Sequence, residues 1–180
     1  MSVPGAVEGM GKTPVKEALV ATLKARGWTI ATAESLTAGL VAATIADVPG
    51  ASAVLRGGLV VYATDLKHVL ADVPQSVLDR HGAVSAETAR ALATGAAARC
   101  RADVGLALTG VAGPDEQEGR PVGTVYVGLC VPGREAWSVR LALAGDRRLI
   151  RDQACDTAMS LVTEVAGGAR PAGGEGGWDR

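Results

Sequence analysis

AESLTAGLVAATIADVPGASAVLRGGLVVYATDLK, residues 33–67, decides the fold of this chain and carries most of its chemically interesting side chains. The preceding residues, WTIATA (28–33), are rich in β-branched side chains and predict a strand that ends where Ser35 begins a loop. Leu40, Val41, Thr44 and Ile45 then follow helical spacing. Residues 35–39 therefore predict a turn into a helix N-terminus, where backbone N–H groups are free to bind an anion or merely to be capped.

The second half of this stretch predicts another strand and another helix. Pro49 and Gly50 break the preceding helix, and residues 53–62 (AVLRGGLVVY) predict a strand with an irregularity at its two glycines. Ser52 then stands at a loop-to-strand junction, and Tyr62 stands at the end of the strand. A helix over residues 64–70 carries Lys67.

Outward from this stretch, helices alternate with strands and a hairpin follows. Ser85 and Asp146 are expected to cap two long helices, and Thr13 to cap the first. The pattern predicts one α/β domain, a three-layer α/β/α sandwich with a mixed β-sheet, over residues 13–166. We expect a flexible leader at 1–12 and a disordered Gly-rich tail at 167–180. The remaining expected helices cover residues 13–26, 74–81, 85–100 and 146–165, and the remaining strands cover 104–109, 124–131 and 135–143.

Composition limits the classes of function. Hydrophobic residues make up 48% of the 180 residues, but aromatics only 3% and Phe is absent, so Ala, Val and Leu must fill the core. The net charge of -1 comes from interspersed charges, which argues against nucleic acid as a partner. The three cysteines are widely spaced, which argues against a disulfide framework or a zinc site. Without a signal sequence or membrane span, we expect a soluble cytoplasmic protein.

The candidate catalytic groups are few. His68 and His81 lack metal-ligand spacing and do not fit a Ser–His–Asp triad, so a serine would need another base. Lys67 can serve if burial lowers its pKa, and its helix follows the strand after Ser52, although a lone lysine on a short helix is more often a solvated charge. Glu34 is either a general base or a partner of the helix dipole.

Other polar residues leave two interpretations open. The acidic residues of the 115–118 segment suit either a solvated loop or a lid over a site, and Arg147 suits a phosphate or a plain surface position. The turn at residues 35–39 matches neither the P-loop nor the dinucleotide-binding fingerprint. The acidic residues are Asp115, Glu116 and Glu118.

Taken together, residues 15–161 resemble the CinA C-terminal domain family, which includes stand-alone nicotinamide-nucleotide amidohydrolases (PncC-like NMN deamidases). We expect no N-terminal nucleotide-pyrophosphatase-like domain of the longer CinA proteins in this chain. Six blocks in order carry the resemblance: ATAESLTAG (31–39), PGASAVLRGGLVVYATDLK (49–67), HGAVSAETA (81–89), LTGVAGPD (108–115), RPVGTVYVG (120–128) and AGDR (144–147).

The resemblance implies hydrolysis of nicotinamide mononucleotide to nicotinic acid mononucleotide and ammonia, in pyridine nucleotide salvage, without a metal or other cofactor. It implies Ser52 as the nucleophile of a Ser/Lys dyad, Lys67 as its base and Tyr62 in the same site, with Ser35 as the second choice of nucleophile. It also implies a homodimer and a small-molecule nucleotide substrate. The expected substrate-binding residues are Ser35, Thr37, Gly39, Thr109, Gly110 and Arg147.

The chain departs from the family pattern in its first block. The pattern there reads ESCTGG, whereas Leu36 replaces the cysteine and Ala38 replaces the first of the paired glycines. Ala38 restricts the turn if a positive φ is required there. These departures favour an alternative function, a catalytically silent nucleotide-binding module that acts through a partner. Hydrolysis of another small amide is a third possibility.

Overall fold

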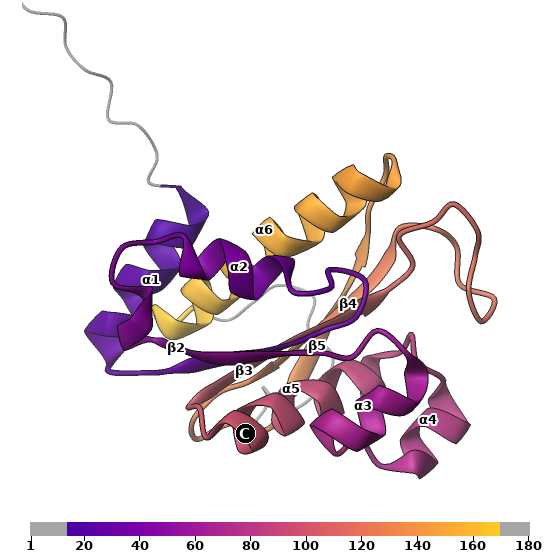
Figure 1. Ribbon diagram of the computed structural model, residues 1–180, viewed down its shortest axis with the longest axis horizontal. Coiled ribbons are helices and arrows are strands. Elements are labelled where there is room, and N and C mark those ends of the chain that lie inside the picture. The colour runs from indigo at the N-terminus through magenta and orange to yellow at the C-terminus, as the bar shows by residue number, and fades with distance from the viewer. Residues whose placement is uncertain (1–13, 170–180) are drawn as a thin grey trace, which may run out of the picture.

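A five-stranded mixed sheet with the order β2-β1-β3-β4-β5 lies at the centre of residues 14–169, the part of the chain that the computed structural model describes (Figure 1). β1 pairs in parallel with both β2 and β3, whereas β3–β4 and β4–β5 are antiparallel. The predicted strands and the terminal hairpin are thereby confirmed. The strands are β1 (Ile30–Glu34), β2 (Leu55–Val60), β3 (Val104–Gly110), β4 (Thr124–Cys130) and β5 (Trp137–Ala142).

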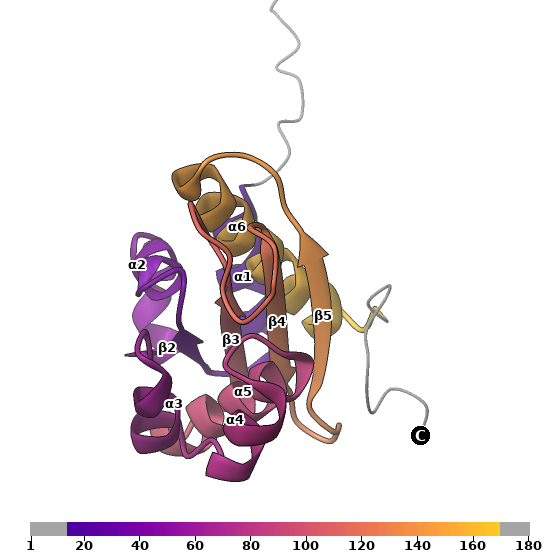
Figure 2. The ribbon, with the colours of Figure 1, turned by 90° about the vertical axis from the view of Figure 1, so that its right-hand side faces the viewer.

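Helices cover both faces of the sheet, which confirms the predicted α/β/α sandwich (Figures 1 and 2). α1 (Val15–Arg26), α2 (Leu40–Ala46) and α6 (Arg147–Ala166) lie on one face. The opposite face carries α3 (Thr64–Ala71), α4 (Gln75–His81) and α5 (Ala86–Cys100), and a short 3-10 helix, η1 (Ala51–Ala53), precedes β2. Among residues 14–169, no helix combines the length and apolar character needed to cross a bilayer.

The helix ends follow from local side-chain chemistry. The Ser85 side chain accepts a hydrogen bond from the Thr88 amide at 3.2 Å, and the Asp146 carboxylate accepts one from the Leu149 amide at 2.8 Å. Both predicted caps are confirmed; each satisfies a backbone donor that a helix start leaves unpaired. The predicted Thr13 cap, the leader and residues 170–180 lie outside the described residues.

Small residues set the spacing between the sheet and α5. A Cβ at Gly95 would lie 1.8 Å from the Ala71 carbonyl oxygen, and one at Gly105 would lie 1.8 Å from the Ala93 carbonyl oxygen. Both positions therefore require glycine for α5 to contact α3 and β3. Ala, Val and Leu fill most of the buried core, as the composition predicts, and Trp137 is the largest fully buried side chain.

Candidate active site

A pocket opens at the edge of the sheet where β1, β2 and β3 end. The registers place Glu34 beside both Val60 and Leu108, so the segments that follow these three parallel strands meet at one edge. Ligand sites in α/β proteins commonly lie at this carboxyl edge of the strands. The pocket is lined by Ser35, Leu36, Tyr62, Ala83, Val84, Thr109, Gly110, Val111, Ala112, Gly113, Asp115, Glu116, Gln117 and Arg147.

Lys67 contacts Ser35, one of the residues that line this pocket. The Lys67 side chain reaches back from α3, and its Nζ lies 3.2 Å from Ser35 Oγ, 2.8 Å from the Val61 carbonyl oxygen and 3.5 Å from the Tyr62 carbonyl oxygen. A neutral amine has two N–H donors and one lone pair. The two carbonyls can accept the donors, which leaves the lone pair for the Ser35 hydroxyl.

Burial favours the neutral form of Lys67. Lys67 is 1% exposed, and desolvation of its ammonium lowers its pKa to about 8, against the opposing effects of the Glu118 and Asp65 carboxylates. At neutral pH an appreciable fraction is therefore unprotonated. The condition set for Lys67, a pKa lowered by burial, is therefore present, and Lys67 is not a solvated surface charge.

Ser52 lies at the opposite edge of the sheet. It belongs to η1, which precedes β2, whereas Lys67 follows β2 on α3. The six residues of β2 separate the two edges by roughly 20 Å at ~3.3 Å per residue. Ser52 is exposed and is not among the residues that line the pocket. The predicted pairing of Ser52 with Lys67 is wrong, and the serine in contact with the lysine is Ser35.

Glu34 holds the turn that carries Ser35. Its carboxylate is 1% exposed and accepts four hydrogen bonds, from Thr32 Oγ1 at 2.9 Å and from the amides of Gly39, Val41 and Ala42 at 3.0, 3.0 and 2.9 Å. These donors include the first turn of α2, so the helix-dipole interpretation of Glu34 is correct. With its oxygens fully engaged, Glu34 stabilises the turn and does not serve as the base.

The predicted binding residues of this turn divide into two groups. Ser35 lines the pocket, whereas Thr37 and Gly39 do not. Thr37 is fully buried, and the Gly39 amide already donates to Glu34. α2 begins at Leu40, directly after the predicted turn, in which Ala38 and Gly39 adopt φ values of 51° and 95°.

Arg147, at the start of α6, contributes a guanidinium to the site. Arg147 lines the pocket, where its Nη2 donates to the Tyr62 hydroxyl at 2.7 Å and its Nη1 donates to the Gly113 carbonyl. Tyr62 is 54% exposed and lies at the pocket mouth. The structure thus brings Arg147 and Tyr62 to Ser35, as expected.

Arg151 supports the Ser35 turn, a contact that the sequence analysis missed. Its Nε donates to the Leu36 carbonyl at 2.9 Å and its Nη2 donates to the Thr37 carbonyl at 3.0 Å, so it braces the Ser35 turn from behind. The available signal was its spacing: Arg151 lies four residues after Arg147 and so shares a face of the same helix.

The β3 end supplies the remaining wall. Thr109 and Gly110 line the pocket, as expected, but the Thr109 side chain is 1% exposed and its hydroxyl donates to the Ala83 carbonyl at 2.6 Å. Thr109 therefore anchors the neighbouring residues Ala83 and Val84, which the sequence analysis did not assign to the site.

Two backbone donors beside Ser35 are available. Within residues 14–169, the amides of Leu36 and Thr37 donate to no hydrogen-bond acceptor. Amides directly after a nucleophile are suitable for stabilising an oxyanion. The same described part of the chain contains no group of three or more His, Cys, Asp or Glu side chains placed to hold a metal ion.

Comparisons with known proteins identify the family. Residues 12–166 match the CinA C-terminal domain. A competence-damage inducible protein of Geobacillus kaustophilus is 51% identical over 129 residues, 72% of this chain and 31% of that protein. A CinA-like protein of Frankia casuarinae is 45% identical over 163 residues, 90% of this chain and 37% of that protein. The chain thus spans about a third of the length of these curated relatives.

Solved structures agree with this assignment. The crystal structure of a CinA superfamily protein from Klebsiella pneumoniae is 30% identical, with a TM-score of 0.83 over 86% of this chain and 96% of that one. A competence/damage inducible protein from Agrobacterium tumefaciens is 31% identical, with a TM-score of 0.78 over 90% of this chain and 97% of that one. The chain therefore belongs to the CinA C-terminal domain family.

Proposed function

We propose that this protein is an amidohydrolase that converts nicotinamide mononucleotide to nicotinic acid mononucleotide and ammonia, with Ser35 as nucleophile and Lys67 as base. The contact between Lys67 Nζ and Ser35 Oγ, 3.2 Å long on a buried lysine, carries the proposal. A serine needs an adjacent proton acceptor to attack an amide, and a desolvated lysine is one of the few side chains that provide it.

The reaction follows from this pair. Lys67 takes the Ser35 proton as Oγ attacks the carboxamide carbon, and the resulting ammonium protonates the nitrogen as the C–N bond breaks and ammonia leaves. Water then attacks the acyl-serine, with Lys67 again accepting a proton, which releases the carboxylic acid and restores Ser35. The amide of Leu36, which follows Ser35 and also lines the pocket, is our candidate for the oxyanion donor.

The remaining lining suits the rest of a nucleotide. Arg147 presents a guanidinium to the pocket and uses only part of its five N–H donors on Tyr62 and Gly113, so it can hold a phosphate group. Tyr62 offers an exposed ring beside it. We assign the phosphate to Arg147 and the carboxamide to the Ser35 end. We also propose a cytoplasmic homodimer; a sedimentation mass equal to one chain would contradict that state.

Ammonia release from nicotinamide mononucleotide tests the function. The wild type should release it with a kcat/KM that rises with pH through about 8, because Lys67 must be neutral. Lys67→Ala should lose about 10²–10⁴-fold, the usual contribution of a general base. Lys24→Ala, which removes an exposed lysine on α1, is the matched control and should retain full activity.

Other outcomes separate the alternatives. Calorimetric binding of the nucleotide by a folded wild type without turnover would support the silent binding module, which Leu36 and Ala38 favour, and would contradict the proposal. Turnover of a different amide in a substrate panel, without turnover of nicotinamide mononucleotide, would keep the dyad and overturn the substrate.

A further inference from the structure

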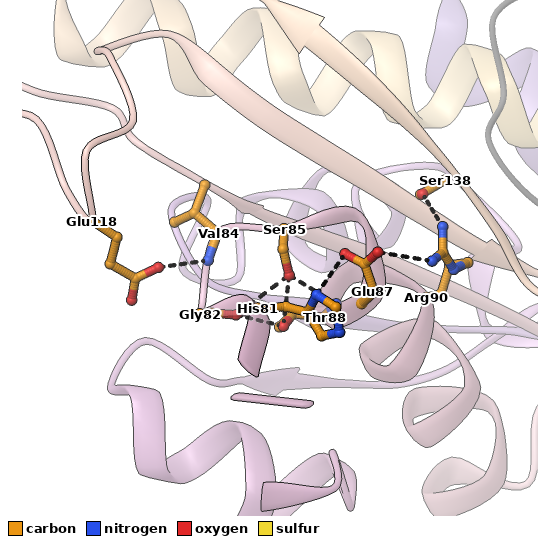
Figure 3. Close-up of polar contacts among 9 residues, drawn as sticks. All are labelled: His81, Gly82, Val84, Ser85, Glu87, Thr88, Arg90, Glu118 and Ser138. Carbon is orange, nitrogen blue, oxygen red and sulfur yellow. Dashed lines mark hydrogen bonds and ion pairs between the residues drawn. The ribbon is translucent and has the colours of Figure 1, made fainter. Parts of the chain in front are cut away.

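A carboxylate outside the dyad is held beside the same pocket. Glu118 lies in the loop between β3 and β4, and its two oxygens accept hydrogen bonds from the amides of Ala83 at 3.1 Å and Val84 at 3.2 Å. Figure 3 shows Glu118 pointing from its loop toward the Val84 nitrogen. Both amide-bearing residues line the pocket that contains Ser35.

The amide pair is a fixed anchor. The Gly82 carbonyl accepts the Thr88 hydroxyl at 2.6 Å and the Ser85 hydroxyl at 3.4 Å at the start of α5 (Figure 3). The Ala83 carbonyl accepts the Thr109 hydroxyl from β3. Because the carbonyls on this segment are tied to a helix and to the sheet, the amides present a stationary site for the Glu118 carboxylate.

The backbone conformation of the β3–β4 loop directs the Glu118 side chain toward these amides. Gln117 and Arg120 exchange backbone hydrogen bonds of 3.2 and 2.8 Å around a turn whose central residues, Glu118 and Gly119, have φ values of 52° and 69°. Two positive φ values are typical of the tight hairpin turn. At the other end, a Cβ on Gly82 would lie 2.4 Å from Glu118 Oε2, so the approach also requires the absence of a side chain at Gly82.

The consequence reaches the dyad in two ways. Asp115, Glu116 and Gln117 precede the turn and line the pocket, so anchoring Glu118 fixes that wall. The Glu118 charge also raises the Lys67 pKa from the loop side while Asp65 raises it from α3, against the larger effect of desolvation. Removing the charge should make Lys67 easier to deprotonate.

We propose that Glu118 is a positioning residue: its carboxylate, bound by the Ala83 and Val84 amides, fixes the β3–β4 loop as a wall of the pocket. This inference rests on the proposed function for its effect on turnover, but the contact and the charge act in the free protein as well. The loop wall then contributes to substrate affinity, whereas the chemistry stays with Ser35 and Lys67.

The experiment compares Glu118→Gln, Glu118→Ala and, as a control for loss of one charge, Glu135→Gln at an exposed position in the β4–β5 connection. Amide hydrogen exchange at Ala83 and Val84 and the NMR titration of the Lys67 side chain are measured without substrate. Steady-state kinetics on nicotinamide mononucleotide provide KM and kcat.

We expect Glu118→Ala to speed exchange at both amides by about tenfold, equivalent to the loss of one net hydrogen bond. It should also raise KM by about tenfold, with kcat changed by less than about threefold, as for lost uniform binding. Glu118→Gln should lower the Lys67 titration midpoint by on the order of half a pH unit, as one charge acting across a partly solvated pocket does. Glu135→Gln should change none of these.

Unchanged amide exchange in Glu118→Ala would overturn the anchor. Faster exchange with wild-type KM and an unmoved Lys67 titration would show a merely structural contact and would also overturn the proposal. If the wild type does not hydrolyse nicotinamide mononucleotide, the proposed function fails, but exchange and the Lys67 titration still decide the role of Glu118.

Discussion

Two serine turns, one at each edge of the sheet, look alike in sequence and differ in every physical respect that matters for catalysis. Ser35 follows β1, lies 3.2 Å from a buried lysine and lines a pocket. Ser52 precedes β2, is exposed and lies on a three-residue helix. Glycines flank both turns, so the surroundings of a serine, rather than its local motif, distinguish a nucleophile from a surface hydroxyl.

The largest expected difference between the two edges is in activity. Ser35→Ala should reduce kcat/KM for ammonia release by at least about 10³-fold, since it removes the attacking atom, whereas Ser52→Ala should remain within about twofold of wild type. The reverse result, with Ser52→Ala inactive and Ser35→Ala active, would move the catalytic site to the amino edge.

The next difference is in stability. Lys67→Met removes a buried ammonium, and the pKa of Lys67, lowered from 10.5 to about 8, corresponds to a cost of about 3 kcal/mol at neutral pH. We expect this inactive variant to be more stable than wild type by roughly 1–3 kcal/mol at pH 7, after loss of the lysine hydrogen bonds. Chemical denaturation measures the change.

The sign of its pH dependence gives a second check. Because the folded-state pKa of Lys67 lies below its unfolded value, the unfolded chain binds more protons between pH 8 and 10.5, and this group makes wild-type stability rise with pH across that window. The difference between Lys67→Met and wild type should therefore shrink from pH 8 to 10.5. A difference that grows with pH would contradict the buried, easily deprotonated lysine.

A difference in stability is also expected between two carboxylates at opposite ends of α2: Glu34, which reaches its first turn from β1, and Asp47, which follows its last residue. In Glu34→Gln, the side-chain NH₂ group replaces a carboxylate oxygen that accepts hydrogen bonds from backbone amides, so donor faces donor. We expect this variant to lower the free energy of unfolding by roughly 2–3 kcal/mol. Asp47→Asn, at the Ser52 side, weakens only an exposed ion pair with Lys16 at 3.4 Å and should cost less than about 1 kcal/mol. Equal losses of unfolding free energy in the two variants would show that Glu34 does not stabilise the Ser35 turn more than an exposed ion pair stabilises the other end of α2.

The smallest effect concerns backbone conformation. Ala38 adopts a φ of 51° and Gly50 a φ of 82°, one in each serine turn. Ala38→Gly should stabilise the protein by about 1 kcal/mol and Gly50→Ala should destabilise it by a similar amount, because alanine is strained at positive φ. Thermal unfolding of the two variants should shift Tm in opposite directions, and a lower Tm for Ala38→Gly would show that its turn is not strained.

The fold was largely predictable because its signals are local. The caps at Ser85 and Asp146 and the ends of the helices predicted over 13–26 and 74–81 each depend on a few neighbouring residues, such as the glycines that follow those two helices. The absence of Phe and the abundance of alanine likewise predicted a close-packed sandwich.

The site was predicted only in part, because it depends on which edge of the sheet each residue lies at. Lys67, Tyr62, Arg147, Thr109 and Gly110 were placed correctly on or beside the pocket. Ser52 was assigned from the family resemblance, and its nearness to Lys67 along the chain supported that assignment. A residue before a strand and a residue after it, however, lie at opposite edges of the sheet. Arg151 and Glu118 form hydrogen bonds with backbone groups of distant turns; the spacing from Arg147 places Arg151 on the same helix face but does not identify these partners.

One helix carries both arginines that contact this site. Arg147 reaches the pocket mouth and Arg151, one turn later, reaches the back of the Ser35 turn. A single residue inserted between them would rotate one relative to the other by about 100° around the helix axis. The four-residue interval in α6 is therefore a fixed length, and an insertion or deletion within it would leave only one of the two arginines in contact with the site.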